Sequence, residues 1–211
     1  DVKFKDLDGD GYINAGSATN GDHGDLAVIG NSTPRYEYSF RIGADYKGFD
    51  ISIFCQGIGK RKIWGSGQLA IPGFNAKEGA IPKAFATDYW REDRTDAFYP
   101  RAWDLGNNNT GFSMQRQSKY LLNMAYLRVK NINLGYSFQQ NLINKVGLTK
   151  ARLYLSLENF ITFDNLRGLP VDPEAISGYS MFTSGHTYNL GRTGTGTPVF
   201  KSLSFGAQLT F

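Results

Sequence analysis

The N-terminal part of the sequence contains an acidic segment whose residue types and spacing could bind a metal ion. In DLDGDGYIN, which begins at residue 6, carboxylates alternate with other residues and a glycine follows the third of them. An EF-hand-like calcium loop has this order, because hard oxygen ligands at alternate positions can surround a hard cation. The predicted ligands are the side chains of Asp6, Asp8, Asp10, Asn14 and Asp25 and the backbone carbonyl of Tyr12.

One part of the calcium-loop pattern is missing. The twelfth position of such a loop normally carries a bidentate acid, but Ser17 stands there. Asp22 or Asp25 could close the ligand shell after the insertion GSATNGDHG. The alternative is an Asp- and Gly-rich turn that binds no metal. If calcium binds, we expect a structural role, in which the ion braces the loop before the first strand.

The segment 61–118 is rich in aromatic and charged residues that could contact a ligand or a partner protein. Tryptophan and tyrosine rings stack on sugars, and charged side chains bind hydroxyl groups or peptide termini. Aromatic residues also pack long loops together or anchor a partner protein, and their spacing here does not decide between these roles. The residues predicted to contact a substrate or a lid are Trp64, Tyr89, Trp90, Tyr99, Arg101 and Trp103.

The sequence offers little for catalysis. His23 and His186 lie in polar, Gly-rich stretches, and the single cysteine, Cys55, forms no Cys/His motif with an orienting partner. We interpret Asp172 and Glu174 in VDPEA as part of a turn rather than as a carboxylate dyad. We therefore predict no enzymatic activity and no catalytic cofactor. The net charge is +4 with scattered basic residues, so no nucleic-acid partner is expected.

Alternating hydrophobicity predicts five β-strands that would position these segments. In RYEYSFRIGADY, for example, apolar and polar residues alternate throughout, which is the two-residue period of a strand. A tight Lys47-Gly48 turn separates the first two strands. The predicted strands span residues 35–46, 49–60, 120–138, 150–163 and 199–211.

Two folds could use these strands. Their apolar faces could pack together in a soluble β-sandwich, or they could face lipid around a water-filled lumen. Three features favour the membrane: strands longer than the about 5–6 residues of soluble sheets, aromatic residues near strand ends, and short turns that alternate with long loops. We predict an all-β fold, an antiparallel transmembrane β-barrel fragment, with the sandwich as the alternative.

The direction of the last strand sets the expected topology. If that strand runs inward, the short turns are periplasmic and the segments 1–34, 61–118 and 164–198 are extracellular loops. We thus divide the chain into an extracellular loop with the acidic turn, 1–34, and a barrel part, 35–211. Five strands are too few to close a barrel, which needs about eight, so we expect a fragment of a longer protein or an oligomer.

Seven motifs follow one another along nearly the whole chain: KFKDLDGDGYI, AVIGNSTPRYEYSF, YKGFDISIFCQG, DYW with YPR, AYLRVKNINLGYSF, ARLYLSLENFITF and FKSLSFGAQLTF. Together they resemble the C-terminal end of SusC-like TonB-dependent transporters of the Bacteroidetes outer membrane. The resemblance implies a barrel of about 22 strands with a plug domain inside, of which this chain would supply about the last five strands. It also implies that Phe211 belongs to the signal that the outer-membrane assembly machinery recognises.

The resemblance further implies a function and partners. The protein would be part of a TonB-dependent importer of oligosaccharides or peptides in the cell outer membrane of a Gram-negative bacterium. Its partners would be a SusD-like surface lipoprotein acting as a lid, TonB through the missing N-terminal part, the glycan or peptide substrate, and membrane lipid with lipopolysaccharide. The rival hypothesis is a secreted, calcium-braced β-sandwich that binds glycans and is soluble without detergent.

Overall fold

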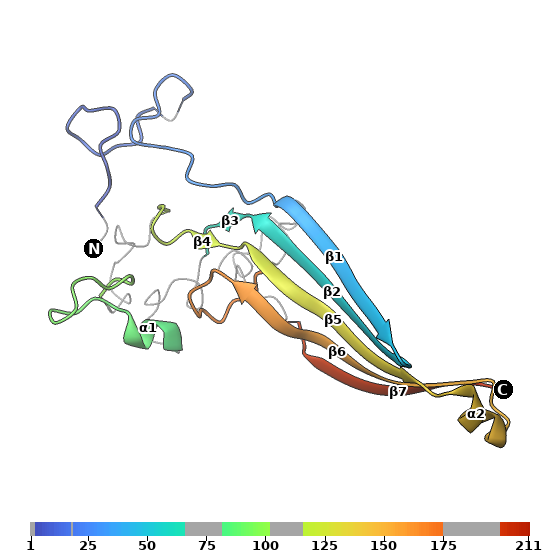
Figure 1. The fold of residues 1–211 in the computed structure, drawn as a ribbon. Coiled ribbons are helices and arrows are strands. Elements are labelled where there is room, and N and C mark those ends of the chain that lie inside the picture. The colour runs from blue at the N-terminus through green and yellow to red at the C-terminus, as the bar shows by residue number, and fades with distance from the viewer. Residues whose placement is uncertain (1–2, 18, 66–81, 102–115, 175–198) are drawn as a thin grey trace, which may run out of the picture.

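The computed structural model describes residues 3–17, 19–65, 82–101, 116–174 and 199–211. Its main element is one antiparallel sheet of five long strands in the order β1-β2-β5-β6-β7. Figure 1 shows these strands side by side in a curved sheet, with loops gathered at one end and α2 and the C-terminus at the other. The strands are β1 (Arg35–Tyr46), β2 (Phe49–Lys60), β5 (Tyr126–Ser137), β6 (Lys150–Asp164) and β7 (Ser202–Thr210).

Short elements complete the described part. β3 (Lys62–Ile63) and β4 (Leu122–Asn123) form a two-stranded sheet, and α1 (Lys83–Thr87) lies among the loops. Between β5 and β6, α2 (Gln140–Ile143) continues into the 3-10 turn η2 (Asn144–Val146). No helix in the described ranges is both long and apolar enough to cross a membrane.

The predicted strand 120–138 is divided in the structure. The residues of β4 pair with β3, and the long strand β5 begins only at Tyr126. The reason is that Tyr120 and Met124 leave the alternation of the main sheet and are buried in a separate cluster among the loops. Tertiary packing thus overrides the strand pattern in this stretch. The last strand is also shorter than predicted, since β7 covers only residues 202–210.

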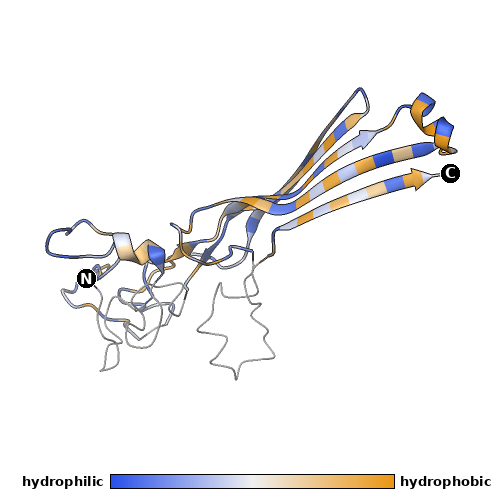
Figure 2. Cartoon of the chain, turned by 90° about the horizontal axis from the view of Figure 1, so that it is seen from below, coloured by the Kyte–Doolittle hydropathy of each residue, from blue (hydrophilic) through white to orange (hydrophobic). Residues whose placement is uncertain are grey.

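The strand register places apolar residues in continuous rows on one face of the sheet, called here the apolar face. Each row takes one residue from each strand, and one row is wholly aliphatic: Ile42, Ile53, Ile132, Leu157 and Leu203. Aromatic residues lie nearer the strand ends: Tyr46, Phe49 and Tyr136 by the turns, and Tyr36, Tyr38 and Phe163 by the loops. Figure 2 shows apolar and polar residues alternating along the strands. Many apolar side chains are exposed, and Leu203 has an exposed fraction of 64%.

The opposite face, called here the polar face, carries side chains that bond across strands. Arg152 on β6 donates to Asp50 on β2, with Nε 2.9 Å from Oδ2, although β5 lies between these strands. Gly135 of β5 makes the bond possible, because a Cβ at that position would collide with both side chains. Gly206 leaves room for the ring of Tyr154 in the same way. The sheet therefore has one exposed apolar face and one internally bonded polar face.

A separate hydrophobic cluster, called here the loop core, lies among the loops. Its buried residues come from the β2–β5 connection and from the segment after β6: Phe85, Tyr99, Tyr120, Leu122, Met124, Leu166, Leu169 and Val171. The side chain of Met124 is fully buried, and Phe85 is 2% exposed. Segments far apart in the sequence are therefore packed against one another at this end of the molecule.

Candidate functional site

The acidic segment folds into a loop that brings together three of the predicted metal ligands. One carboxylate oxygen from each of Asp6, Asp8 and Asp25 lies within 4.8 Å of the other two. Three carboxylates so close together offer the hard oxygen ligands that calcium prefers. Asp25, rather than Asp22, is the acid that approaches the turn, because Asp22 accepts the backbone N–H of Ser17 at 2.9 Å.

Backbone hydrogen bonds hold this loop in shape. Asp6 accepts the N–H of Gly9 at 2.6 Å, and Gly9 has a left-handed φ of 81° that suits glycine. Asp25 accepts the N–H groups of Leu7 at 2.5 Å and Asn14 at 2.9 Å. These two bonds lower the pKa of the Asp25 carboxyl, so the group is charged at neutral pH and joins the start of the loop to its end.

Asp10 and Asn14 have other contacts. Asp10 accepts the N–H of Tyr12 at 2.7 Å and the side-chain amide of Asn14 at 3.3 Å. The side-chain oxygen of Asn14 accepts the N–H of Gly16 at 2.7 Å. Both side chains thus bond to the loop itself, and Asp10 is not part of the three-carboxylate group.

Several of the predicted ligand-binding aromatic residues lie in or beside the loop core. Tyr99 is 3% exposed, and its ring packs edge-on against Phe98 with the centroids 5.0 Å apart. Burial raises the pKa of the Tyr99 hydroxyl. Tyr89 stacks on Phe85 at 5.3 Å, and Trp64 packs against the cluster as a partly buried side chain. Tyr99 therefore supports the loops rather than presenting an open ring face.

The remaining predicted site residues are spread over different environments. Trp90 is half-buried, and its backbone N–H donates to the carbonyl of Tyr99 at 3.1 Å. Arg101 is exposed at the end of a described segment, and Trp103 lies outside the described residues. Phe211, the predicted assembly signal, follows β7 and is 86% exposed.

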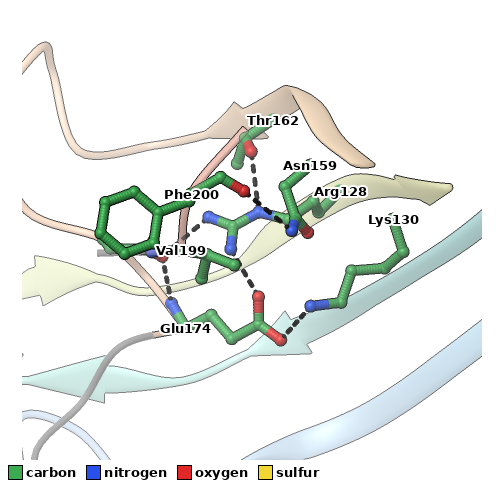
Figure 3. Close-up of polar contacts among 8 residues, drawn as sticks. Arg128, Lys130, Asn159, Thr162, Glu174, Val199 and Phe200 are labelled. Atoms are coloured by element: carbon green, nitrogen blue, oxygen red, sulfur yellow. Dashed lines mark hydrogen bonds and ion pairs between the residues drawn. The ribbon is translucent and has the colours of Figure 1, made fainter. Parts of the chain in front are cut away.

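A buried ion-pair network links β5 to the segment after β6 (Figure 3). Arg128 is 4% exposed, and its guanidinium donates to Glu174 at 2.5 Å, to Asp172 at 2.7 Å and to the hydroxyl of Thr162 at 2.8 Å. Lys130 donates to the second carboxylate oxygen of Glu174 at 2.6 Å. Each charge is therefore both paired and hydrogen-bonded, as a buried charge must be to avoid a large desolvation cost.

This network also fixes the chain on both sides of residues 175–198. Asp172 accepts the N–H of Val199 at 3.3 Å, and the side chain of Asn159 donates to the carbonyl of Phe200 at 3.2 Å. Burial raises the pKa of Asp172, but the hydrogen bond from Arg128 and backbone N–H donors outweigh it, so the pKa lies below its usual value. The carboxylate is thus charged when it holds these two segments together.

The interpretation of Asp172 and Glu174 as a turn describes only part of their role. The N–H of Glu174 does donate to Asp172 at 2.9 Å, as in an Asx turn. Both side chains are in addition the counter-charges of Arg128. The sequence does contain a signal for this role. Arg128 and Lys130 in LRVKN are two cations beside apolar strand residues, and such cations require nearby carboxylates as partners.

Comparisons with known proteins connect this geometry to a family. No family model matches the sequence. TonB-dependent receptor P3 of Formosa agariphila is 30% identical over 172 residues, which cover 82% of this chain and 15% of that receptor. TonB-dependent receptor P39 of the same organism is 26% identical over 180 residues, covering 80% of this chain and 15% of that receptor.

Solved structures agree with these sequence relatives. The RagAB peptide importer matches with a TM-score of 0.59 in both its open-open and closed-closed states, over 87% of this chain and 18% of the matched chain. The sequence identities are 23% and 25%. The chain belongs to the SusC-like TonB-dependent receptors. It spans about 15% of the length of the curated relatives that it matches.

Membership in the TonB-dependent receptors confirms the predicted fold class, an all-β, antiparallel transmembrane β-barrel fragment. The sandwich alternative needed a second sheet over the apolar face, and besides the main sheet the described residues form only the two-stranded sheet of β3 and β4. The relatives are receptors and transporters, which supports a role other than catalysis. TonB-dependent receptors are outer-membrane proteins of Gram-negative bacteria.

Proposed function

We propose that the receptor to which this chain belongs is an active importer in the outer membrane of a Gram-negative bacterium. It would take up oligosaccharides or peptides, obtain energy through TonB, and work with a SusD-like surface lipoprotein that closes over the barrel as a lid. The family relationship and the sequence motifs support this proposal. Peptides are the cargo class that we favour, because the solved relative at 25% identity is named a peptide importer.

The observation that carries the proposal is the uncovered apolar face of the five-stranded sheet. Ile42 and Leu203, at opposite edges of one apolar row, are 61% and 64% exposed. A water-soluble protein rarely leaves so wide an apolar surface open. Contact with lipid removes this cost, and the aromatic residues near the strand ends suit the two membrane interfaces.

The polar face and the loops suggest how this part of the receptor would act. The polar face would line the lumen, where the Asp50–Arg152 pair meets water or a plug domain. We place the two-residue turn at Lys47-Gly48 and the α2 connection on the periplasmic side, and the loop core outside the cell. In that orientation the packed loops form a fixed rim around the barrel mouth, against which cargo or a lid could bind.

We also propose that the acidic loop holds one calcium ion with a structural role. The support is the approach of Asp6, Asp8 and Asp25 to within 4.8 Å of one another in a loop whose sequence follows the calcium-loop order. The ion would join Asp25 to the turn at Asp6 and thereby brace the chain that leads into β1.

The test of the import function uses the full-length receptor in its own cells. We expect deletion of the receptor gene to abolish uptake of fluorescent short peptides or oligosaccharides, and an uncoupler or loss of TonB to abolish it equally. Deletion of a neighbouring gene for a SusD-like lipoprotein should reduce uptake strongly. Unchanged accumulation of every labelled cargo in the receptor deletion strain would contradict the proposal.

A further inference from the structure

A cavity of about 440 Å³ lies beside the loop core, and none of the roles above uses it. Its walls come from three separate parts of the chain, represented by Phe98, Lys119 and Arg167. The volume lies within the range of about 300–1,000 Å³ that is usual for small-molecule sites. Leu122 and Leu169 of the loop core add apolar wall surface.

Two cations line this cavity. The ammonium group of Lys119 lies 5.8 Å from the ring centre of Phe98 and 5.4 Å from that of Tyr120. Within the described residues Lys119 has no ion-pair partner. The guanidinium of Arg167 lies 4.0 Å from the centre of the Phe98 ring, and its ion pair within the described residues is a long one, 3.4 Å, with Asp88.

Asp164 is the one acidic residue among the described residues that line the cavity, and it does not balance the charge of the two cations. Asp164 accepts the backbone N–H of Leu166 at 2.9 Å. Asp88, the partner of Arg167, also pairs with Arg94 at 2.9 Å. Two lining cations therefore stand against one lining carboxylate, and an anionic group is the complementary ligand.

The aromatic rings around the cavity pack on one another and on Arg167. Tyr99 and Tyr120 stack on each other at 6.5 Å, and Phe98 packs edge-on against Tyr120 at 5.6 Å. Arg167 covers a face of Phe98. A sugar ring needs an open aromatic face for stacking, so this arrangement favours an anion on a flexible, partly apolar body over a carbohydrate.

Tyr99, which lines the cavity through part of its side chain, also has a buried polar atom. The hydroxyl of Tyr99 is shielded from solvent and has no hydrogen-bond partner in the part of the chain that the structure describes. Native proteins rarely leave such a group unpaired.

We infer that this cavity binds the C-terminal carboxylate of a short peptide, with Lys119 as the main contact to the carboxylate and Arg167 as the second. Charge-assisted hydrogen bonds from these two groups would hold the carboxylate. Leu122 and Leu169 would contact the last side chain. The inference rests on the proposed import function and deepens it, because it names the chemical end by which the cargo is recognised.

The test compares two probes on the purified full-length receptor in detergent. One is a tripeptide with a free C-terminal carboxylate, and the other is the same tripeptide with a C-terminal amide. Isothermal titration should give about tenfold tighter binding of the acid, the usual effect of one charge-assisted hydrogen bond. In Lys119→Gln this preference should fall below about twofold, whereas Lys145→Gln, which removes an exposed charge in η2, should preserve it.

Lys119→Gln is the primary variant because Lys119 makes no side-chain hydrogen bond within the described residues. Arg167→Gln serves as the second variant, and thermal unfolding is measured for both variants because both cations lie over the Phe98 ring. Equal binding of acid and amide by the unmodified receptor would overturn the inference, as would an equal loss of both probes in Lys119→Gln. Binding of a glucuronate disaccharide in place of the tripeptide would overturn the peptide assignment.

Uptake measured in the same strains separates this inference from the import proposal. A receptor that prefers the acid probe but imports no cargo retains the site and refutes the proposed function. If the unmodified receptor shows no preference for the acid probe, and the Lys119→Gln receptor imports cargo normally, the import function stands and the proposed site is refuted.

Discussion

The sheet and the loop core are stabilised in different ways. In the sheet, contacts repeat: each strand pairs with its neighbour in a regular register, and apolar side chains such as Leu203 point outward. In the loop core, contacts do not repeat, and Phe85, Tyr99 and Met124 meet from distant segments in a small interior. The sheet therefore depends on an apolar surrounding, whereas the loop core excludes water by itself.

This difference teaches that one chain can contain two kinds of hydrophobic surface with opposite requirements. The apolar face is satisfied by lipid, so its composition matters more than the exact fit of its side chains. The loop core follows the rules of a soluble protein interior, where close packing and cavity formation decide stability. Mutations in the two regions should therefore differ in how much stability they remove, in how far through the structure the loss spreads, and in whether the loss depends on the membrane.

The largest effect is expected in the loop core. Met124→Ala should cost about 2–5 kcal/mol of local stability, because it leaves a cavity at a fully buried position. Hydrogen exchange of the full-length receptor should show faster exchange at Tyr99 and Leu166 and unchanged exchange in β6. The control Leu142→Ala, at an exposed position in α2, should change little. Equal acceleration throughout the sheet would mean that the two regions are not separate.

A charge on the apolar face should act on the whole sheet. Leu203→Arg should destabilise the receptor by about 2–4 kcal/mol if the residue lies near the bilayer midplane. Its matched control is Ser204→Arg, the adjacent residue of β7, which belongs to the polar face. Urea titration of the receptor in lipid vesicles measures both variants. Similar losses in the two would argue against lipid contact at the apolar face.

The junction between the two regions is the Arg128 network. Arg128→Gln should cost about 1–3 kcal/mol, because Asp172 and Glu174 lose their main cation. Lys130→Gln, which removes only a contact to Glu174, should cost less. Limited proteolysis near residues 172 and 199 should detect the loosened segment. A variant as resistant as the unmodified receptor would show that the network does not hold these segments.

The same network predicts a dependence on pH. The folded pKa of Asp172 lies below its ordinary value of 3.8, so its contribution is present above pH 3.8 and is lost as the pH falls through the lower folded value. In Arg128→Gln this acid-dependent loss should be smaller, because the hydrogen bond that lowers the pKa is gone. The free energy of unfolding is measured from pH 7 down to pH 2 for the unmodified receptor and for Arg128→Gln. Parallel curves of stability against pH would contradict the role of Arg128 in lowering the pKa of Asp172.

The smallest effect on stability is expected at the acidic loop, which lies outside both regions. Asp25→Asn should weaken calcium binding by about tenfold, since ligand charge sets the affinity of such sites. Asp22→Asn is the matched control, because it removes the same charge from the same segment but from an acid that bonds to Ser17. Calorimetry with calcium measures both. Loss of calcium binding in Asp22→Asn but not in Asp25→Asn would identify Asp22, rather than Asp25, as the closing ligand.

Sequence periodicity predicts the sheet better than the loops for a physical reason. The alternation of residues 35–46 and 49–60 coincides with β1 and β2, because each side chain's face follows directly from its position along a strand. The same alternation rule predicts a third strand over residues 120–138, but the long strand β5 begins only at Tyr126. Tyr120 and Met124 continue the apolar pattern, but their side chains find a partner surface in the loop core instead.

The candidate sites depend on contacts that no local pattern encodes. Arg128 meets Asp172 and Glu174 across sequence separations of 44 and 46 residues. Asp25 approaches Asp6, although the calcium-loop pattern places the last ligand at the twelfth position, which is residue 17 in this sequence. Ligand types could thus be predicted from residue chemistry, whereas the choice between Asp22 and Asp25 required the fold.

The bond between Asp172 and the N–H of Val199 brings the described chain on either side of residues 175–198 together at one carboxylate. A chain that leaves and returns at the same point can be lengthened or exchanged with little effect on the strands on either side. In the proposed orientation the connection between these two points is a suitable place to graft an epitope for display on the cell surface. It also offers receptors of this type a way to diversify their outer surface while keeping the same barrel.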